Sequence, residues 1–134
     1  MGVLDGKVAV VTGASRGIGR AIAEELAAGG AAVIVNYATD VDGAAATVDA
    51  ITKLEGHASA FQADVADLSA AENLIKHAVT EYGKLDILVN NAGISRDGLF
   101  HQIGPEDFAA VVGTHLKGTF NTCRHAVPLM MQQR

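Results

Sequence analysis

A glycine-rich loop between a strand-like run and a helical stretch limits the possible folds of this chain more than any other feature. Three of the four residues at 8–11 are valine, and the run leads directly into residues 12–19, Thr-Gly-Ala-Ser-Arg-Gly-Ile-Gly. Glycine allows positive φ and lets backbone amides approach an anion, and a helix that starts here directs the positive end of its dipole to the same place. The loop therefore predicts a phosphate-binding site between a strand and a helix.

The spacing of the glycines indicates which phosphate ligand the loop holds. Gly13, Gly17 and Gly19 form Gly-x-x-x-Gly-x-Gly, which differs from Gly-x-Gly-x-x-Gly and lacks the Lys-Ser/Thr ending of a P-loop. This spacing favours binding of a dinucleotide pyrophosphate and disfavours a loop for ATP hydrolysis. The alternative is an ordinary strand-to-helix turn, which glycines also mark. We expect the whole loop to contact the cofactor: Gly13, Ala14, Ser15, Arg16, Gly17, Ile18 and Gly19.

Short apolar runs alternate with longer helical stretches along the chain. Such alternation is typical of βαβ units with right-handed crossovers and a parallel sheet. We expect a Rossmann-like, doubly wound α/β fold truncated to about four strands in the order 3-2-1-4, with helices on both faces. The expected strands are residues 7–11, 32–36, 57–63 and 85–90; the expected helices are residues 17–28, a stretch between Asp40 and Gly56, a stretch between Asp67 and Gly83, and one that starts near Pro105.

Apolar spacing also predicts which side chains of these helices face the sheet. It places Ile18 on the inward face of the first helix and Leu54 on that of the second. Pro128 lies in the apolar stretch 126–131 and is expected to kink or interrupt the last helix, because proline lacks an N–H and clashes with the preceding turn.

Composition excludes several classes of partner. The net charge is -5, and no run of Lys or Arg offers a surface for nucleic acid. No apolar run is long enough to span a membrane, and the five histidines show no metal-ligand spacing. Cys123 is the single cysteine, which excludes an internal disulfide and fits a reducing cytoplasm.

Two further motifs follow the third and fourth expected strands. Asp64 and Val65 follow the third strand, and the run Asn90, Asn91, Ala92 and Gly93 follows the fourth. Together with the glycine loop, these residues resemble the short-chain dehydrogenase/reductase family along the whole chain. Residues 85–97 look most like the 3-oxoacyl-[acyl-carrier-protein] reductase branch.

The resemblance implies a role for each motif. The glycine loop would hold the pyrophosphate, Asp64 would accept from the adenine amino group, and Val65 would lie beside the ring. Residues 90–93 would line the adenosine and its ribose. All these loops lie at carboxyl ends of strands, where open α/β sheets bind ligands. A turn with a strand-end hydrogen bond is the alternative for Asn90 and Asn91.

The end of the second strand decides between the two nicotinamide cofactors. A carboxylate there would bind the ribose 2′-hydroxyl of NAD and repel the 2′-phosphate of NADP, but this chain has Asn36 and Tyr37. Arg16 supplies a cation for that phosphate. We therefore expect NADP(H), with NAD(H) possible because Asp40 or Asp42 could fold back toward the ribose.

The proton shuttle that the family uses, Tyr-x-x-x-Lys, is missing. The two tyrosines, Tyr37 and Tyr82, have Val41 and Asp86 four residues later. The resemblance implies NADP(H)-dependent hydride transfer to a ketone. The ketone substrate would be a small molecule or a 3-oxoacyl thioester attached to a carrier protein. Residues 1–134 look like the nucleotide-binding portion of one domain without its catalytic portion. We expect the isolated chain to be inactive, so a non-catalytic dinucleotide-binding fragment is the alternative.

His115 stands where the family commonly has an asparagine that joins a proton relay. Imidazole can donate and accept protons, so His115 is the candidate catalytic residue, and a structural hydrogen bond is the alternative. Some acyl-thioester dehydrogenases of the family also have histidine there, which keeps a 3-hydroxyacyl-CoA dehydrogenase open. Family dimers further suggest a homo-oligomer through the last helix, with four apolar side chains expected to be exposed: Phe120, Val127, Leu129 and Met130.

Overall fold

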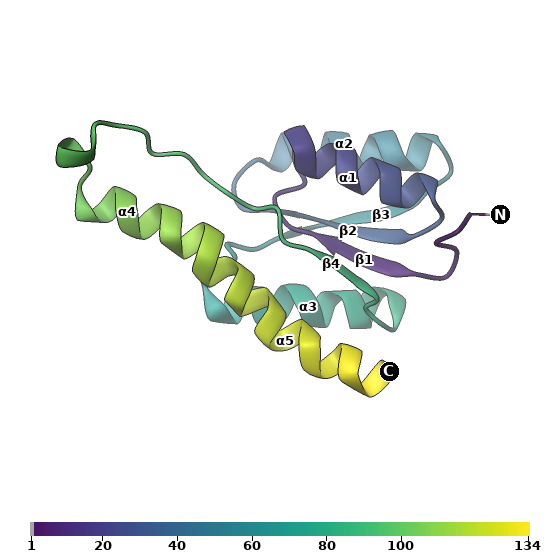
Figure 1. Ribbon diagram of the computed structural model, residues 1–134. Coiled ribbons are helices and arrows are strands. Elements are labelled where there is room, and N and C mark those ends of the chain that lie inside the picture. The colour runs from purple at the N-terminus through teal and green to yellow at the C-terminus, as the bar shows by residue number, and fades with distance from the viewer. Residues whose placement is uncertain (1) are drawn as a thin grey trace.

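The computed structural model describes residues 2–134 and contains one parallel sheet of four strands, in the order β3-β2-β1-β4 (Figure 1). This order confirms the prediction. The strands are β1 (Val8–Val11), β2 (Ala32–Tyr37), β3 (His57–Gln62) and β4 (Ile87–Val89). In register, Val10 of β1 is paired with Ile34 of β2 on one side and with Leu88 of β4 on the other.

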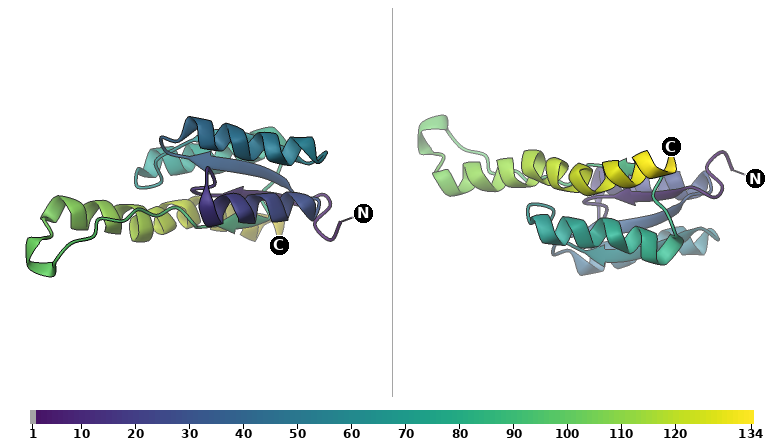
Figure 2. Two further views of the ribbon diagram at one scale, coloured as in Figure 1. Left: turned by 90° about the horizontal axis from the view of Figure 1, so that it is seen from above. Right: turned by 90° about the horizontal axis from the view of Figure 1, so that it is seen from below.

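Helices cover both faces of the sheet, as expected for a doubly wound fold (Figures 1 and 2). One face carries α1 (Gly17–Ala28) and α2 (Val41–Lys53), and the other carries α3 (Leu68–Tyr82) and α5 (Gly118–Gln133). Because side chains alternate along a strand, β1 contributes to two separate cores. Val8 and Val10 pack with residues of α3 and α5, whereas Ala9 and Val11 pack with residues of α1 and α2.

The helix ends follow the signals in the sequence. The Asp40 carboxylate caps α2 by accepting a hydrogen bond from the amide of Gly43 at 3.0 Å, and Asp67 caps α3 in the same way. Gly83 ends α3 in the left-handed conformation, with φ of 85°. These ends confirm the expected boundaries within a few residues.

Three local expectations are wrong. Ile18 is 74% exposed, because it lies in the first turn of α1 beyond the end of the sheet, and Leu54 is 84% exposed, because α2 has already ended at Lys53. Pro128 does not interrupt α5, which runs through it to Gln133. Pro128 lies on an exposed side of α5. Water can therefore reach the carbonyl of the preceding turn, which receives no hydrogen bond from proline.

An arm, which we define as residues 94–117, extends away from the sheet (Figures 1 and 2). It contains a 3₁₀ turn (Phe100–Gln102), α4 (Pro105–Val112) and a π-helical turn (Gly113–Lys117) that leads directly into α5. No residue of the arm is buried. Its apolar side chains therefore take no part in the two cores.

The edge of the sheet at β4 is partly covered by α5. The side-chain amide of Gln133 accepts a hydrogen bond from the Leu85 N–H at 3.2 Å and donates one to the Leu85 carbonyl at 2.6 Å. Beyond this point, β4 pairs with β1 and with no other strand of residues 2–134. β4 is therefore an edge strand of the sheet.

Candidate functional site

A groove of about 630 Å³ lies at the carboxyl ends of β1, β2 and β3 and beside the segment that follows β4. This is the edge at which parallel α/β sheets bind ligands. The groove brings together most of the residues that the sequence singled out: Gly13, Ser15, Arg16, Ile18, Asn36, Tyr37, Asp64, Val65, Asn91, Ala92 and Gly93.

The glycines of the loop serve two different purposes. Gly13 and Gly17 have φ of 62° and 60°, a conformation that other residues rarely adopt. Gly19 does not have positive φ; a Cβ there would lie 2.3 Å from the Gly13 carbonyl oxygen, so glycine is needed for close packing within the loop. The first turn of α1 begins at Gly17, next to the groove.

Asn36 fixes the loop rather than offering its polar atoms to a ligand. Its side chain is 1% exposed, and its Oδ1 accepts a hydrogen bond from the Gly13 N–H at 3.2 Å. Its Nδ2 donates to the carbonyls of Ala63 and Phe61 at 3.1 and 3.3 Å. Asn36 therefore joins β1, β2 and β3 at the point where the groove begins.

A second lock joins the glycine loop to the segment after β4. Thr12 Oγ1 accepts hydrogen bonds from the amides of Asn91 and Ala92, both at 2.9 Å. The Asn91 side chain donates to the carbonyls of Thr12 and Gly13, both at 3.1 Å. The sequence motif includes Thr12, but no role was predicted for its side chain. Its position at the end of a buried strand could have indicated a structural hydrogen bond.

Asn90 points away from the groove, unlike its neighbours. Its Oδ1 accepts a hydrogen bond from the Thr122 hydroxyl, and its Nδ2 lies 3.5 Å from the sulfur of Cys123. Asn90 therefore connects the end of β4 to α5. The same helix also supplies Asn121, whose side chain donates to the Val65 carbonyl at 2.9 Å.

The charged residues around the groove differ in what they contact. Arg16 and Asp64 are exposed, and Asp64 accepts a hydrogen bond from the Ala66 amide at 3.0 Å. Asp40 also lines the groove, but its carboxylate is engaged in capping α2. Asp42 lies in the first turn of α2 and does not line the groove.

His115 lies in a smaller hollow of about 430 Å³ that adjoins the groove, where Arg16, Ser95 and Arg96 also line the wall. Its Nε2 is 3.0 Å from the Ile94 nitrogen and 2.9 Å from the Ile94 oxygen. A Cβ at Gly93 would lie 2.4 Å from the imidazole ring, so the ring packs directly on this backbone.

The sequence did not single out Arg96, whose Nε is 3.7 Å from an oxygen of Asp107. It gave no sign of Arg96 because an arginine in a polar loop has no periodicity or spacing to mark it. Ile94, Thr39 and Thr114 also line these hollows and were likewise not predicted.

Neither tyrosine is placed for proton transfer with a lysine. Tyr82 lies in the last turn of α3, outside the groove, and burial raises its pKa above the usual value of 10.0. Tyr37 lines the groove, but no lysine does so among the described residues. The groove thus has a tyrosine but no lysine beside it among the described residues.

Every helix in residues 2–134 is too short or too polar to span a membrane. No group of three or more His, Cys, Asp or Glu residues in this part of the chain is arranged to hold a metal ion.

A family model described as short chain dehydrogenase matches residues 7–134. The chain belongs to the short-chain dehydrogenase family. A 3-oxoacyl-[acyl-carrier-protein] reductase FabG from Staphylococcus aureus is 47% identical over 128 residues, which are 96% of this chain and 52% of the relative. Elsinochrome reductase 1 from Elsinoe fawcettii is 49% identical over 92% of this chain and 46% of its own length.

Solved structures of the family have the same fold. A short-chain dehydrogenase from Mycobacterium avium superposes with a TM-score of 0.93 at 46% identity, covering 98% of this chain and 48% of the other. One from Burkholderia cenocepacia, solved in complex with NADP, gives 0.91 at 41% identity over 94% of this chain and 51% of the other. The chain thus spans about half the length of these family members.

Proposed function

We propose that the groove binds a nicotinamide dinucleotide, with its pyrophosphate on the glycine loop. The observation that carries this proposal is that the Gly13 and Ala14 carbonyl groups of the loop accept hydrogen bonds from the protein, while the Ser15 and Arg16 N–H groups have no acceptor among residues 2–134. Free amides at the start of a helix suit an anion. A family member solved with NADP supports this assignment.

The charges around the groove favour NADP(H) over NAD(H). Arg16 is exposed and lines the groove, where it can bind the 2′-phosphate. Asn36 stands where a carboxylate would repel that phosphate, and the nearby Asp40 carboxylate is engaged with the Gly43 amide. In the proposed complex, Tyr37 lies beside the ribose, while Asp64 and Val65 border the adenine.

The proposed parent reaction is hydride transfer from NADPH to the ketone of a 3-oxoacyl thioester, free or carried by a protein. When bound, the cofactor supplies the hydride. Residues 1–134 form the nucleotide-binding portion of one domain in this proposal, and they bind and orient the cofactor. A Tyr-x-x-x-Lys pair is not among them, so the 134 residues by themselves should bind cofactor without turnover.

His115 is the proposed proton-transfer residue within this portion. Its Nε2 contacts the backbone of Ile94 at the hollow next to the groove, and the π-helical turn that carries it is an irregularity common at functional sites. The test uses an active family member that has histidine at the position of His115. Replacing that histidine with asparagine should change the pH profile of kcat while leaving the Kd for NADPH unchanged. An unchanged profile would leave His115 a structural role only.

The cofactor preference is tested by titrating the protein with NADPH and with NADH, using the fluorescence of each nicotinamide. Arg16→Ala should weaken NADPH binding by about tenfold, because a charge-assisted hydrogen bond to phosphate is lost, and should leave NADH binding nearly unchanged. Arg20→Ala is the matched control, since Arg20 pairs with Glu24 outside the groove. Equal losses for both cofactors would refute the preference, and no binding of either by the wild type would refute the site.

We also propose that a second copy of the chain pairs with the exposed apolar side of the arm and α5. Phe108, Leu116 and Phe120 are 66%, 70% and 61% exposed, and Val127 is 48% exposed. The expectation for the remaining two residues is wrong, because Leu129 and Met130 are half-buried against the core beside α3. The proposed interface therefore lies nearer the arm than the sequence suggested.

A further inference from the structure

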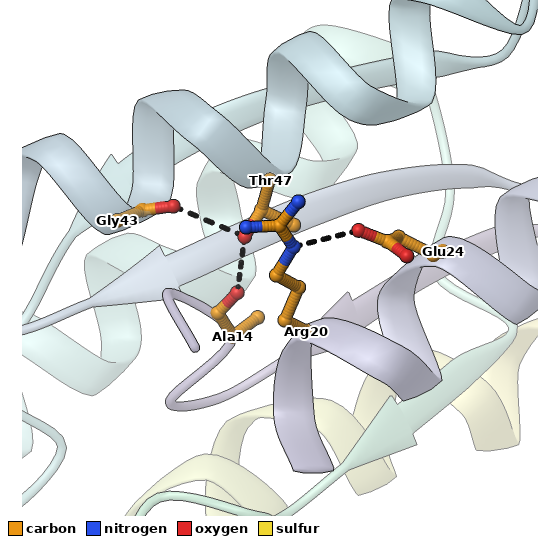
Figure 3. Close-up of polar contacts among 5 residues, drawn as sticks. All are labelled: Ala14, Arg20, Glu24, Gly43 and Thr47. Carbon is orange, nitrogen blue, oxygen red and sulfur yellow. Dashed lines mark hydrogen bonds and ion pairs between the residues drawn. The ribbon is translucent and has the colours of Figure 1, made fainter. Parts of the chain in front are cut away.

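Ala14, in the middle of the glycine loop, is held by the protein at both of its backbone polar groups. Its N–H donates to the carbonyl of Asn36 at 2.8 Å. Its carbonyl accepts a hydrogen bond from the hydroxyl of Thr47, on α2, at 2.9 Å (Figure 3). Ala14 and Thr47 are both 0% exposed, so neither group has water as a substitute partner.

The bond from Thr47 determines the direction of the next amide. A peptide unit is planar and trans, so its carbonyl and the N–H of the following residue point in opposite directions. Because the Ala14 carbonyl points toward α2, the Ser15 N–H points away from α2. No acceptor for that N–H is found among the described residues, and Ser15 lines the groove.

Gly43 reinforces the same arrangement one turn earlier on α2. A Cβ at this position would lie 2.6 Å from the Ser15 carbonyl oxygen, so only glycine lets that carbonyl approach the helix. Two successive carbonyls of the loop, those of Ala14 and Ser15, thus face the first turns of α2. By the same geometry, the amides of Ser15 and Arg16 are directed to the other side.

The neighbouring ion pair shows how specific this contact is. Arg20 and Glu24 of α1 form an ion pair, with Nε and Oε1 2.7 Å apart (Figure 3), yet each is about 40% exposed and neither bonds to the loop through its side chain. Thr47 has one alternative acceptor, the Gly43 carbonyl of its own helix at 3.1 Å. That local bond is the usual one for a helical threonine, whereas the bond to Ala14 joins residues 33 positions apart.

We propose that Thr47 is a positioning residue for the pyrophosphate subsite: its hydroxyl holds the Ala14 carbonyl so that the Ser15 amide faces the bound phosphate. The proposal rests on the dinucleotide site proposed above and adds a determinant on α2, outside the glycine motif. The pyrophosphate is common to NADPH and NADH. Loss of the hydroxyl should therefore weaken both cofactors by the same factor, unlike loss of Arg16.

The test compares three variants of the full chain by fluorescence titration, with thermal melting of each. Thr47→Val removes the hydroxyl at nearly constant volume and should raise the Kd for NADPH and for NADH about fivefold each. Thr47→Ser keeps the hydroxyl and should restore most of the affinity. Thr52→Val is the matched control on the same helix, because the Thr52 hydroxyl is exposed and bonds only to the Asp49 carbonyl.

Adenosine 2′-monophosphate separates positioning from general damage, since it carries the adenosine and the 2′-phosphate but no pyrophosphate. Its affinity should be the same in the wild type and in Thr47→Val. Equal weakening of this ligand and NADPH, or a lower melting temperature with unchanged Kd for both dinucleotides, would overturn the proposal. A wild-type chain that binds no dinucleotide would overturn the dinucleotide site itself, which is a distinguishable failure.

A second measurement needs no variant and covers the case in which Thr47→Val does not fold. In the wild-type chain, the Ser15 amide resonance should shift strongly and exchange more slowly with solvent when NADPH binds. The Thr52 amide, within α2, should not respond. A Ser15 amide that is unaffected by saturating NADPH would contradict the proposed orientation.

Discussion

The body of the molecule, residues 2–89 with α5, and the arm, residues 94–117, use their apolar residues in opposite ways. In the body, every residue of β1 is at most 3% exposed, and helices cover both faces of the sheet. In the arm, Phe100 is 93% exposed, Leu116 is 70% exposed, and no residue is buried. Apolar side chains are therefore covered in the body and uncovered in the arm.

The difference teaches that the glycine loop is held in place by the body, although Ile94, Arg96, Ala110 and Thr114 of the arm also line the groove. The glycine loop is fixed by Asn36, Asn91 and Thr47, all within or directly after elements of the body. Apolar residues that cover nothing contribute little to the stability of a single copy. Substitutions in the body should therefore affect unfolding and cofactor binding, whereas substitutions of exposed apolar residues of the arm, such as Phe108 and Leu116, should affect association.

The largest expected effect is in the core of the body. Leu74 on α3 is 0% exposed, and Leu74→Ala should lower the free energy of unfolding by about 3 kcal/mol, measured by urea denaturation. Leu54→Ala is the control, because Leu54 is 84% exposed and its truncation should cost less than about 0.5 kcal/mol. Similar losses for the two variants would break the distinction between buried and exposed leucines.

The next effect concerns the junction beneath the groove. Asn36→Leu should lower the free energy of unfolding by about 2 kcal/mol. It leaves the Gly13 N–H and the carbonyls of Phe61 and Ala63 without their hydrogen-bond partner. NADPH binding should weaken as well, since the loop loses this support. Wild-type affinity in a destabilised Asn36→Leu protein would show that the loop keeps its shape without Asn36.

A smaller effect with a pH signature is expected at Asp86, which joins the starts of β1 and β4. Burial acts to raise the pKa of Asp86, but the hydrogen bond from the Val8 N–H and the nearby Lys84 outweigh it and lower the pKa below 3.8. The ionised carboxylate therefore stabilises the fold at pH above the unfolded-state value, and this contribution is lost as the pH falls through the lowered folded-state value.

Asp86→Asn should accordingly cost about 1 kcal/mol at pH 7 and at pH 5, measured by urea denaturation. The difference from the wild type should shrink below about pH 4, where the wild-type carboxyl begins to take up its proton. A difference that stays constant down to pH 2 would show that the charge of Asp86 contributes nothing to the stability of the body.

The smallest effect on stability is expected in the arm. Phe108→Ser and Leu116→Ser should each change the free energy of unfolding of the monomer by less than about 0.5 kcal/mol. The same variants should reduce self-association, measured by sedimentation at several protein concentrations. A loss of several kcal/mol in a monomer would mean that the arm is part of the folding core and would end the comparison.

The sequence was sufficient for the architecture because periodicity reports directly on parallel strands and covered helices. The strand order, the caps at Asp40 and Asp67, and the inward face of α3 followed from it. Ile18 and Leu54 were misplaced because a periodic pattern does not show where the sheet beneath a helix ends. The effect of Pro128 was overestimated, because the loss of one backbone hydrogen bond on an exposed helix face costs little stability.

The candidate site was predictable as a set of loops but not as a set of orientations. Gly13, Asp64 and Asn91 were placed correctly at one edge of the sheet. Asn36 turns inward because a buried amide side chain must satisfy its own donors and acceptors, and Asn90, although exposed, turns toward the Thr122 hydroxyl of α5. Thr47 lies outside any motif, and Arg96 lies in a run that supported the resemblance without a role for its side chain, so only the three-dimensional arrangement shows where the two residues act.

The π-helical turn at Gly113–Lys117 changes the direction in which side chains of α5 point relative to those of α4. One residue beyond the normal count in a helical turn rotates all later side chains by about 100° relative to a continuous α-helix. Ala110 and Thr114 can thereby line the groove while Gly118, Thr122 and Ala126 remain buried against the body. Deleting a single residue from this turn would make the helix more regular, yet it would turn one of these two faces to solvent.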